Sequence, residues 1–268
     1  MHRLNHQPKI FFFHNPKAAG SAIRSILEPR FAESVRSPSI VNDLCGHEAL
    51  AGRYRPFQGY DYYGGHYGRD VFESVEAGHL ATTNFRNPVS RVVSLYNYFR
   101  HSVTLTEAEL GSERFFAVKA AKTLEFGRFV TSSDPRIEVY IRNQHYRQLT
   151  ASCWSLAMTG SLAETCRFVD TMPWYYVCEH PDLSALWARH ALGWTAARLP
   201  RANITTGPQA EMIRVEELDR MTCRAICEKN RLDLALYQHA VGQFLQRVTV
   251  LSSEADYPET RGFEAAVA

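Results

Sequence analysis

Residues 9–27 read KIFFFHNPKAAGSAIRSIL, and this order of residue types predicts a strand, a loop and a helix. The apolar run from Ile10 to Phe13 fits a buried strand, and the turn-prone Asn15-Pro16 ends it. The helical part places its apolar residues on one face, at Ile23, Ile26 and Leu27. Such a unit favours phosphate, because loop amides and the positive end of the helix dipole face the anion.

Three residues of the loop are suited to binding an anion. Lys17 supplies a mobile positive charge, Gly20 lets the backbone approach closely, and Ser21 can cap the helix and donate its hydroxyl. The loop differs from the nucleotide-triphosphatase motif G-x-x-x-x-G-K-[ST], because Ala18 follows the lysine and offers no oxygen to magnesium. The sequence therefore predicts phosphate chemistry without that metal site. An ordinary β–α turn with a surface lysine remains the alternative for the loop alone.

A second strand–turn–helix unit follows at residues 80–99. Leu80 to Phe85 predicts a strand, Arg86 stands at its end, and Pro88 suits the first turn of a helix. Ser94 lies eight residues after Arg86 (94 − 86 = 8), about two turns along that helix. The planar fork of an arginine matches a phosphate monoester. The alternatives are an arginine paired with a carboxylate and a small serine at a helix contact.

The rest of the chain predicts more strands and helices in alternation. Tyr60–Tyr67 and Trp174–Cys178 are expected to be strands, 32–60 is expected to be loop with short helix, and Pro200–Gln209 and the tail after Ser252 are expected to be irregular. Helices are expected at Phe115–Val130, Ile137–Leu149, Asp182–Leu192, Glu211–Asn230 and Leu232–Val248. This alternation predicts an α/β fold in which helices flank a central parallel sheet, with one domain over residues 1–268.

Composition narrows the classes of partner. The chain has 268 residues with 45% hydrophobic and 22% charged residues, and a net charge of +2 does not favour nucleic acid. The apolar run near the N-terminus is too short for a signal peptide or a membrane span, so we expect a soluble, cytoplasmic protein that is not integral to a membrane. The six cysteines contain no C-x-x-C pair and are expected to be reduced.

Together the two units resemble the signature that binds 3′-phosphoadenosine 5′-phosphosulfate (PAPS) in the sulfotransferase family that includes the heparan sulfate 2-O-sulfotransferases and bacterial relatives. The stretch FFHNPKAAGS at 12–21 is similar to that family's 5′-phosphosulfate loop, usually P-K-T-A-G-T-[ST]. The stretch RNPVSRVVSLY at 86–96 is similar to its 3′-phosphate string, R-[DN]-P…R…S-x-Y. The resemblance implies a P-loop-nucleotide-hydrolase-like sulfotransferase fold. It also implies sulfuryl transfer from PAPS to a hydroxyl acceptor, a carbohydrate, glycan or small molecule, by in-line displacement without a metal.

The resemblance also assigns residues. It implies that Lys17 is catalytic and contacts the 5′-phosphate and bridging oxygen, and that His66, in Gly64-Gly65-His66, is the general base. The implied donor-binding residues are Pro16, Lys17, Ala18, Ala19, Gly20, Ser21, Ala22, Arg86 and Ser94. His14 is a secondary candidate for the base. Ala18 and Ala22 stand where the family usually has hydroxyl side chains, and Gly64 where the heparan enzymes have a second histidine, so weaker donor binding and another acceptor are expected.

Two other functions stay open for the sequence. A small-molecule kinase would share the fold and the lysine, but would carry a magnesium-binding hydroxyl after Lys17 and an acidic metal ligand. A non-catalytic nucleotide-binding module would keep the phosphate-binding residues and need no base. Several tyrosines are equally suited to stack on sugar rings or to fill the core, namely Tyr62, Tyr63, Tyr67, Tyr96 and Tyr98.

Overall fold

The computed structural model describes residues 8–38, 58–152, 154–194, 208 and 211–255. Its centre is a four-stranded sheet of β1 (Ile10–Phe13), β2 (Tyr62–Gly65), β3 (Leu80–Phe85) and β4 (Tyr176–Val177). The strands lie in the order β2-β1-β3-β4, and every neighbouring pair is parallel. The α/β class and the central parallel sheet predicted from the sequence are confirmed.

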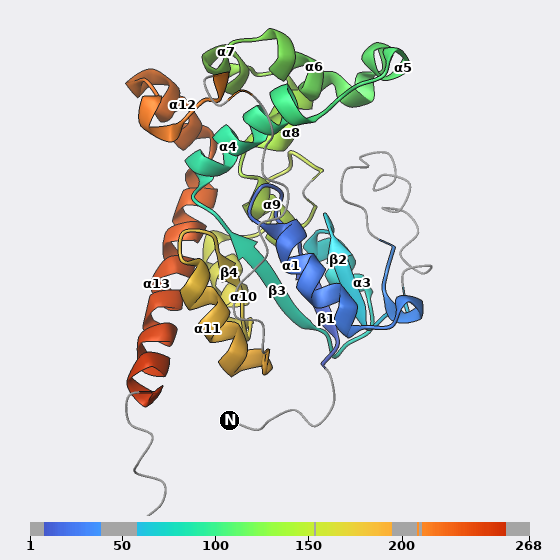
Figure 1. The fold of residues 1–268 in the computed structure, drawn as a ribbon, viewed down its shortest axis with the longest axis vertical. Coiled ribbons are helices and arrows are strands. Elements are labelled where there is room, and N and C mark those ends of the chain that lie inside the picture. The colour runs from blue at the N-terminus through green and yellow to red at the C-terminus, as the bar shows by residue number, and fades with distance from the viewer. Residues whose placement is uncertain (1–7, 39–57, 153, 195–207, 209–210, 256–268) are drawn as a thin grey trace, which may run out of the picture.

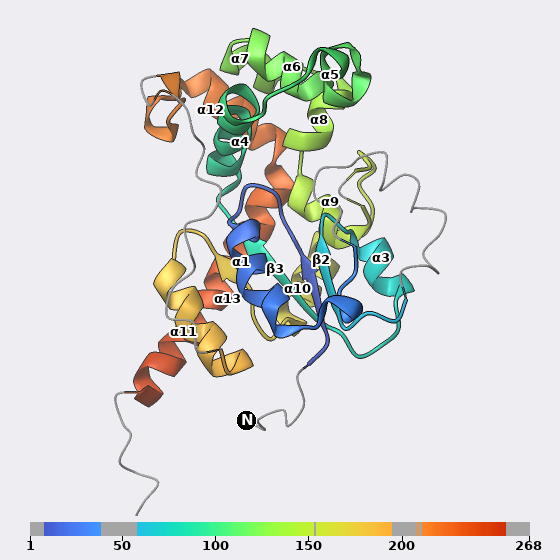
Figure 2. The ribbon, with the colours of Figure 1, turned by 45° about the vertical axis from the view of Figure 1, so that its right-hand side comes forward.

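The strands are hydrophobic because both faces of the sheet are covered. All four residues of β1 are buried, as the apolar run predicted. Helix α1 (Gly20–Leu27) covers one face, while α9 (Gln144–Thr150) and α10 (Leu162–Thr171) cover the other (Figures 1 and 2). Helices α11 (Pro181–Leu192) and α13 (Arg231–Ala255) lie beside β4, and α3 (Arg69–Ser74) lies beyond β2.

A layer of helices stands over the carboxyl ends of the strands (Figure 1). It has its own hydrophobic cluster, to which residues such as Val92, Phe129 and Ile226 contribute. Its elements are α4 (Pro88–Asn97), the π-helical turn η4 (Tyr98–Ser102), α5 (Glu107–Gly111), α6 (Phe116–Thr123), α7 (Phe126–Thr131), α8 (Pro135–Ile141) and α12 (Arg220–Lys229). Pro88 is the first residue of α4, as predicted, and the Asn87 side chain caps that helix by accepting from the amides of Val89 and Ser90.

Four predicted helices were wrong in extent. Phe115–Val130 is interrupted at Leu124, whose backbone is extended, and Ile137–Leu149 is interrupted at Asn143, which is left-handed with φ 41°. Within Glu211–Asn230, the α-helix begins only at Arg220, after the cap Asp219. The last helix continues to Ala255, past the expected start of the irregular tail. Apolar periodicity continues across a two-residue break, such as those between α6 and α7 and between α8 and α9, so the spacing alone does not reveal these interruptions.

Some predictions lie outside the described residues, namely those for most of 32–60 and of Pro200–Gln209. Within the described part of 32–60, Glu33–Val35 forms a short 3₁₀ helix, in agreement with the expected short helix. The strand expected at Trp174–Cys178 is reduced to Tyr176–Val177.

None of the helices in the described part of the chain has the length and apolar character that a membrane span needs. Cys166, Cys178, Cys223 and Cys227 form no disulfide.

Candidate functional site

One pocket lies where the four strands end. The residue directly after each strand lines it, namely His14 after β1, His66 after β2, Arg86 after β3 and Cys178 after β4. The pocket has a volume of about 540 Å³ and is further lined by Pro16, Lys17, Ala19, Gly20, Ser21, Ser90, Ser94, Tyr98 and Glu179. It spans the junction between β1 and β3, from which the chain proceeds to opposite edges of the sheet. Open parallel sheets bind their ligands at such a junction.

The loop between β1 and α1 has an unusual backbone. Lys17 and Ala19 both adopt the left-handed conformation with φ 65°, although neither is glycine. Each such residue costs about 1–3 kcal/mol, and such strain gathers at ligand clamps. Backbone that turns through left-handed residues forms concave anion-binding nests of amide groups. The loop therefore has the shape of an anion cradle.

Gly20 also has a role that the sequence did not predict. It is the first residue of α1 and is not left-handed, but a β-carbon there would lie 1.9 Å from Cδ2 of His14. Glycine is thus required so that the helix can start against the imidazole. The predicted cap at Ser21 was wrong: Ala19 is the N-cap, no side chain caps α1, and Ser21 is the second helical residue, where it lines the pocket.

Two buried asparagines hold the loop against β3. The Asn84 side chain accepts from the amide of Asn15 at 2.7 Å and donates to the carbonyls of Asn15 and Ala18 at 2.9 and 2.5 Å. The Asn15 side chain donates in return to the carbonyl of Asn84 at 3.2 Å. Neither asparagine was among the site residues predicted from the sequence. A polar residue near the end of a buried strand nevertheless indicates that its side chain makes hydrogen bonds there.

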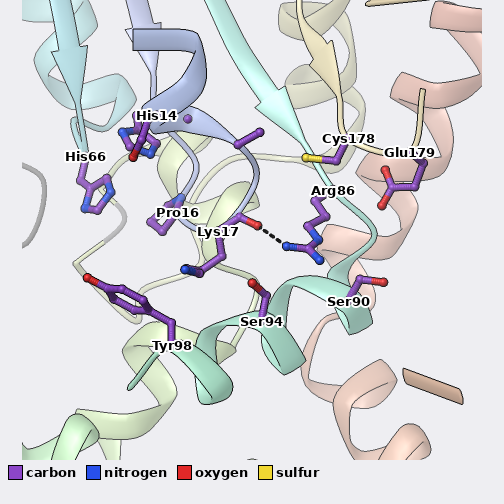
Figure 3. A pocket seen from close by; sticks show the side chains of 13 residues that line it. His14, Pro16, Lys17, His66, Arg86, Ser90, Ser94, Tyr98, Cys178 and Glu179 are labelled. Carbon is purple, nitrogen blue, oxygen red and sulfur yellow. Dashed lines mark hydrogen bonds between the residues drawn. The ribbon is translucent and has the colours of Figure 1, made fainter. Parts of the chain in front are cut away.

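Lys17 projects into the middle of the pocket (Figure 3). Its Nζ lies 3.8 Å from the centroid of the Tyr98 ring. Burial lowers the pKa of Lys17 to about 8, and the nearby charge of Arg86 adds to this effect. Among the described residues, no carboxylate is within ion-pair distance of Lys17. The site thus holds a poorly solvated cation that an anion would stabilise.

Arg86 links the second unit to the first. Its Nη1 donates to the carbonyl of Lys17 at 2.9 Å, so the guanidinium lies against the loop (Figure 3). The alternative of a carboxylate partner is not found within the described ranges. Ser90 and Ser94 follow on α4 at successive turns and line the same pocket. Ser90 was missed, although the spacing 86, 90, 94 predicts one shared face.

Two histidines close the other end of the pocket. The rings of His14 and His66 are 4.8 Å apart and nearly perpendicular, and each residue is only 4% exposed. Gln148 donates to the carbonyls of His14 and Tyr67, which ties together the segments that follow β1 and β2. Burial, with the charges of Arg24 and Lys17, lowers the pKa of His14 to about 3. His14 is therefore neutral at neutral pH.

The structure brings most of the predicted site residues together. Eight of them line the pocket, namely Pro16, Lys17, Ala19, Gly20, Ser21, His66, Arg86 and Ser94. Ala18 and Ala22 do not, because their side chains are buried, at 0% and 4% exposure. Gly64 leaves no open space beside it, since a β-carbon there would lie 2.3 Å from the Tyr62 hydroxyl. Of the five tyrosines, only Tyr98 lines this pocket, and Tyr62, Tyr63, Tyr67 and Tyr96 are buried in the core.

Cys178 and Glu179 were missed because they join the pocket only through the pairing of β4 with β3. Glu179 is the acidic residue of the lining, and its Oε1 accepts from the amide of Asn87 at 2.8 Å. Within the described residues, no three histidine, cysteine or acidic side chains cluster as metal ligands would.

A scan against protein-family models finds no match, and a search of curated proteins finds no similar sequence.

Proposed function

We propose that this chain is a PAPS-dependent sulfotransferase with a P-loop-like sulfotransferase fold. The observation that carries the proposal is the meeting of Lys17 and Arg86, from two different strand ends, in one pocket with His66. In the described part of the chain neither cation has a carboxylate partner, so the pocket suits a ligand that brings two separated anionic groups.

The pocket residues divide into roles along its length. Arg86, Ser90 and Ser94 lie toward one end and would hold the 3′-phosphate, while Lys17 and the loop amides in the middle would hold the 5′-phosphosulfate. His66 at the other end would take the proton of the acceptor hydroxyl. A new bond forms between the acceptor oxygen and sulfur as the bond from sulfur to the bridging oxygen breaks. The products are a sulfate ester and adenosine 3′,5′-bisphosphate.

The donor test is calorimetry with adenosine 3′,5′-bisphosphate and adenosine 5′-phosphate. We expect the bisphosphate to bind more tightly, and Arg86→Ala to weaken it by ~1.5–3 kcal/mol, the size of a charge-assisted hydrogen bond. The control is Arg69→Ala, because Arg69 pairs with Glu73 outside this pocket. Equal binding of both nucleotides would refute the 3′-phosphate assignment.

A small-molecule kinase is the second candidate, and Glu179 is the observation in its favour, because a kinase needs an acidic metal ligand. The Ala18 side chain is fully buried and offers no hydroxyl to a metal. Turnover with PAPS should therefore survive excess chelator. Complete loss that magnesium restores, or phosphoryl transfer from ATP, would establish the kinase instead. A non-catalytic nucleotide-binding module would show no turnover that depends on His66.

The acceptor is proposed to be a hydroxyl of a carbohydrate, glycan or small molecule, and a mass-spectrometric screen with PAPS identifies it. We further propose a reducing, cytoplasmic setting. The four described cysteines without a disulfide support it. Titration of the denatured, unreduced protein should then find all six thiols free, and four or fewer would contradict this setting.

A further inference from the structure

Tyr98 lines the pocket at the point where α4 passes into a π-helical turn. α4 ends at Asn97, and Tyr98 is the first residue of the π-helical turn η4. Its neighbours Tyr96 and Phe99 are buried in the hydrophobic cluster of the helical layer, whereas Tyr98 lines the pocket. Tyr98 follows Ser90 and Ser94 at the same four-residue spacing, and its backbone is α-helical with φ −62° and ψ −47°, so it continues the face of α4 that lines the pocket.

The turn that carries Tyr98 is held from the helical layer. Arg100 donates to the Tyr96 hydroxyl at 3.0 Å and to the carbonyl of Ala121 at 2.9 Å. Lys122 donates to the carbonyl of Arg100 at 3.0 Å. Asn97 exchanges two hydrogen bonds with the backbone of Ile213, at 2.8 and 3.1 Å. The backbone that carries Tyr98 is therefore held by contacts that do not involve the loop between β1 and α1.

Lys17, in contrast, has few partners of its own. Within the described residues its ammonium makes no ion pair or hydrogen bond. It lies over the Tyr98 ring instead, with Nζ 3.8 Å from the ring centroid. The other four lysines all have polar partners: Lys9 pairs with Asp61, Lys229 pairs with Glu138, and Lys119 and Lys122 donate to carbonyls. A lysine side chain with four rotatable bonds would otherwise sample many positions.

We propose that Tyr98 is a positioning residue whose ring face holds the Lys17 ammonium in the middle of the pocket, where the anionic group of the donor binds. The ring attracts the cation without neutralising it, so the full charge stays available to the ligand, which a carboxylate partner would prevent. The position of the lysine stands on the geometry alone, whereas its effect on donor and turnover rests on the proposed function. The Tyr98 hydroxyl is not needed for this role.

The position of the lysine is tested by NMR on protein whose lysines are reductively methylated with isotope-labelled formaldehyde, a change that keeps their charge. The chain has five lysines, so few signals overlap, and Lys17→Arg assigns the signal of Lys17. We expect that signal to be shifted upfield by the ring current, to keep the shift in Tyr98→Phe and to lose it in Tyr98→Leu. An unshifted signal in the unsubstituted protein, or an unchanged one in Tyr98→Leu, overturns the proposal.

The consequence for function is tested on the unmethylated protein. Tyr98→Leu should lower turnover or bisphosphate affinity by about fivefold to thirtyfold, the size of a desolvated cation–π contact, and Tyr98→Phe should keep both. Thermal unfolding of both variants shows whether the fold is kept. If the unsubstituted protein binds no bisphosphate, the proposed function fails while the NMR result still decides the position of Lys17. If Tyr98→Leu folds and acts as the unsubstituted protein does, the positioning role is wrong.

Discussion

Gly20 and His14 are in direct contact, because a β-carbon on Gly20 would lie 1.9 Å from Cδ2 and 2.1 Å from Nε2 of the imidazole. The first turn of α1 therefore packs on the residue that follows β1. His14 is 4% exposed and stacks on Phe12, with ring centroids 5.7 Å apart, so it has little room to move aside. This contact joins the start of α1 to the end of β1.

We expect Gly20→Ala to lower the free energy of unfolding by ~1–3 kcal/mol, the usual cost of overpacking. His14→Ala should create the missing space, so the double variant should recover much of the loss. Chemical denaturation of the four proteins measures this coupling. Additive effects would show that the contact is relieved in some other way. Gly111→Ala is the control, since nothing lies within 4 Å of a β-carbon there.

The sequence predicted the sheet and the pocket because both follow from local signals. The aromatic run of β1, Pro88 at the start of α4 and the cations after two strands each lie within a short segment. Glu179 and Ser90 show what such signals miss. Glu179 reaches the pocket through the pairing of β4 with β3, a contact over 90 residues of chain, as the bond between Asn87 and Glu179 shows. Ser90 could have been predicted only by following the spacing of residues along the whole face of α4.

The contact of Gly20 with His14 was missed for a related reason. Glycine in a phosphate loop indicates close approach of the backbone, but the sequence does not show what approaches. Here His14 lies against Gly20, and the left-handed conformations fall on Lys17 and Ala19, which have side chains. Local residue preferences point away from both positions, so only tertiary bonds such as those of Asn84 explain them.

The lowered pKa of Lys17 predicts how donor binding depends on pH. Its pKa is lowered to about 8 by burial and by Arg86, so the free protein loses this charge as pH rises through that value. A bound anion favours the charged form, and affinity for adenosine 3′,5′-bisphosphate should therefore fall as pH rises above about 8. Lys17→Arg, which stays charged, should bind with little change over the same range. Calorimetry at several pH values measures this, and a parallel decline in both proteins would exclude Lys17 as the cause.

Two buried histidines predict acid sensitivity. Burial lowers the pKa of His14 and of His145 to about 3, from the usual ~6.5. Between these values the unfolded chain binds more protons than the native one, so each histidine lowers stability by ~1.4 kcal/mol per pH unit as pH falls through this window. His145→Gln should make the slope of unfolding free energy against pH shallower below pH ~6.5. His190→Gln, at an exposed position on α11, should leave the slope unchanged. Equal slopes in all three proteins would contradict the prediction.

The final prediction concerns His66 as the general base. Both His14 and His66 line the pocket, but a histidine with a pKa of about 3, such as His14, is too weak a base to accept a hydroxyl proton efficiently at neutral pH. His66→Ala should therefore lower turnover by about 10²–10⁴-fold and leave bisphosphate affinity nearly unchanged. The ascending limb of the pH–rate profile should vanish in this variant. His14→Ala should instead alter donor binding, since the ring supports the loop that carries Lys17.

A matched control separates the base from a structural histidine. His79 is buried like His66, but its ring nitrogens bond to the carbonyls of Glu76 and Tyr60 and it does not line the pocket. His79→Gln should reduce stability without changing the pH–rate profile. Near-normal turnover in His66→Ala with a competent acceptor would require another base. Because the low pKa of His14 disfavours it, the search would then turn to water held by the pocket or to the acceptor itself.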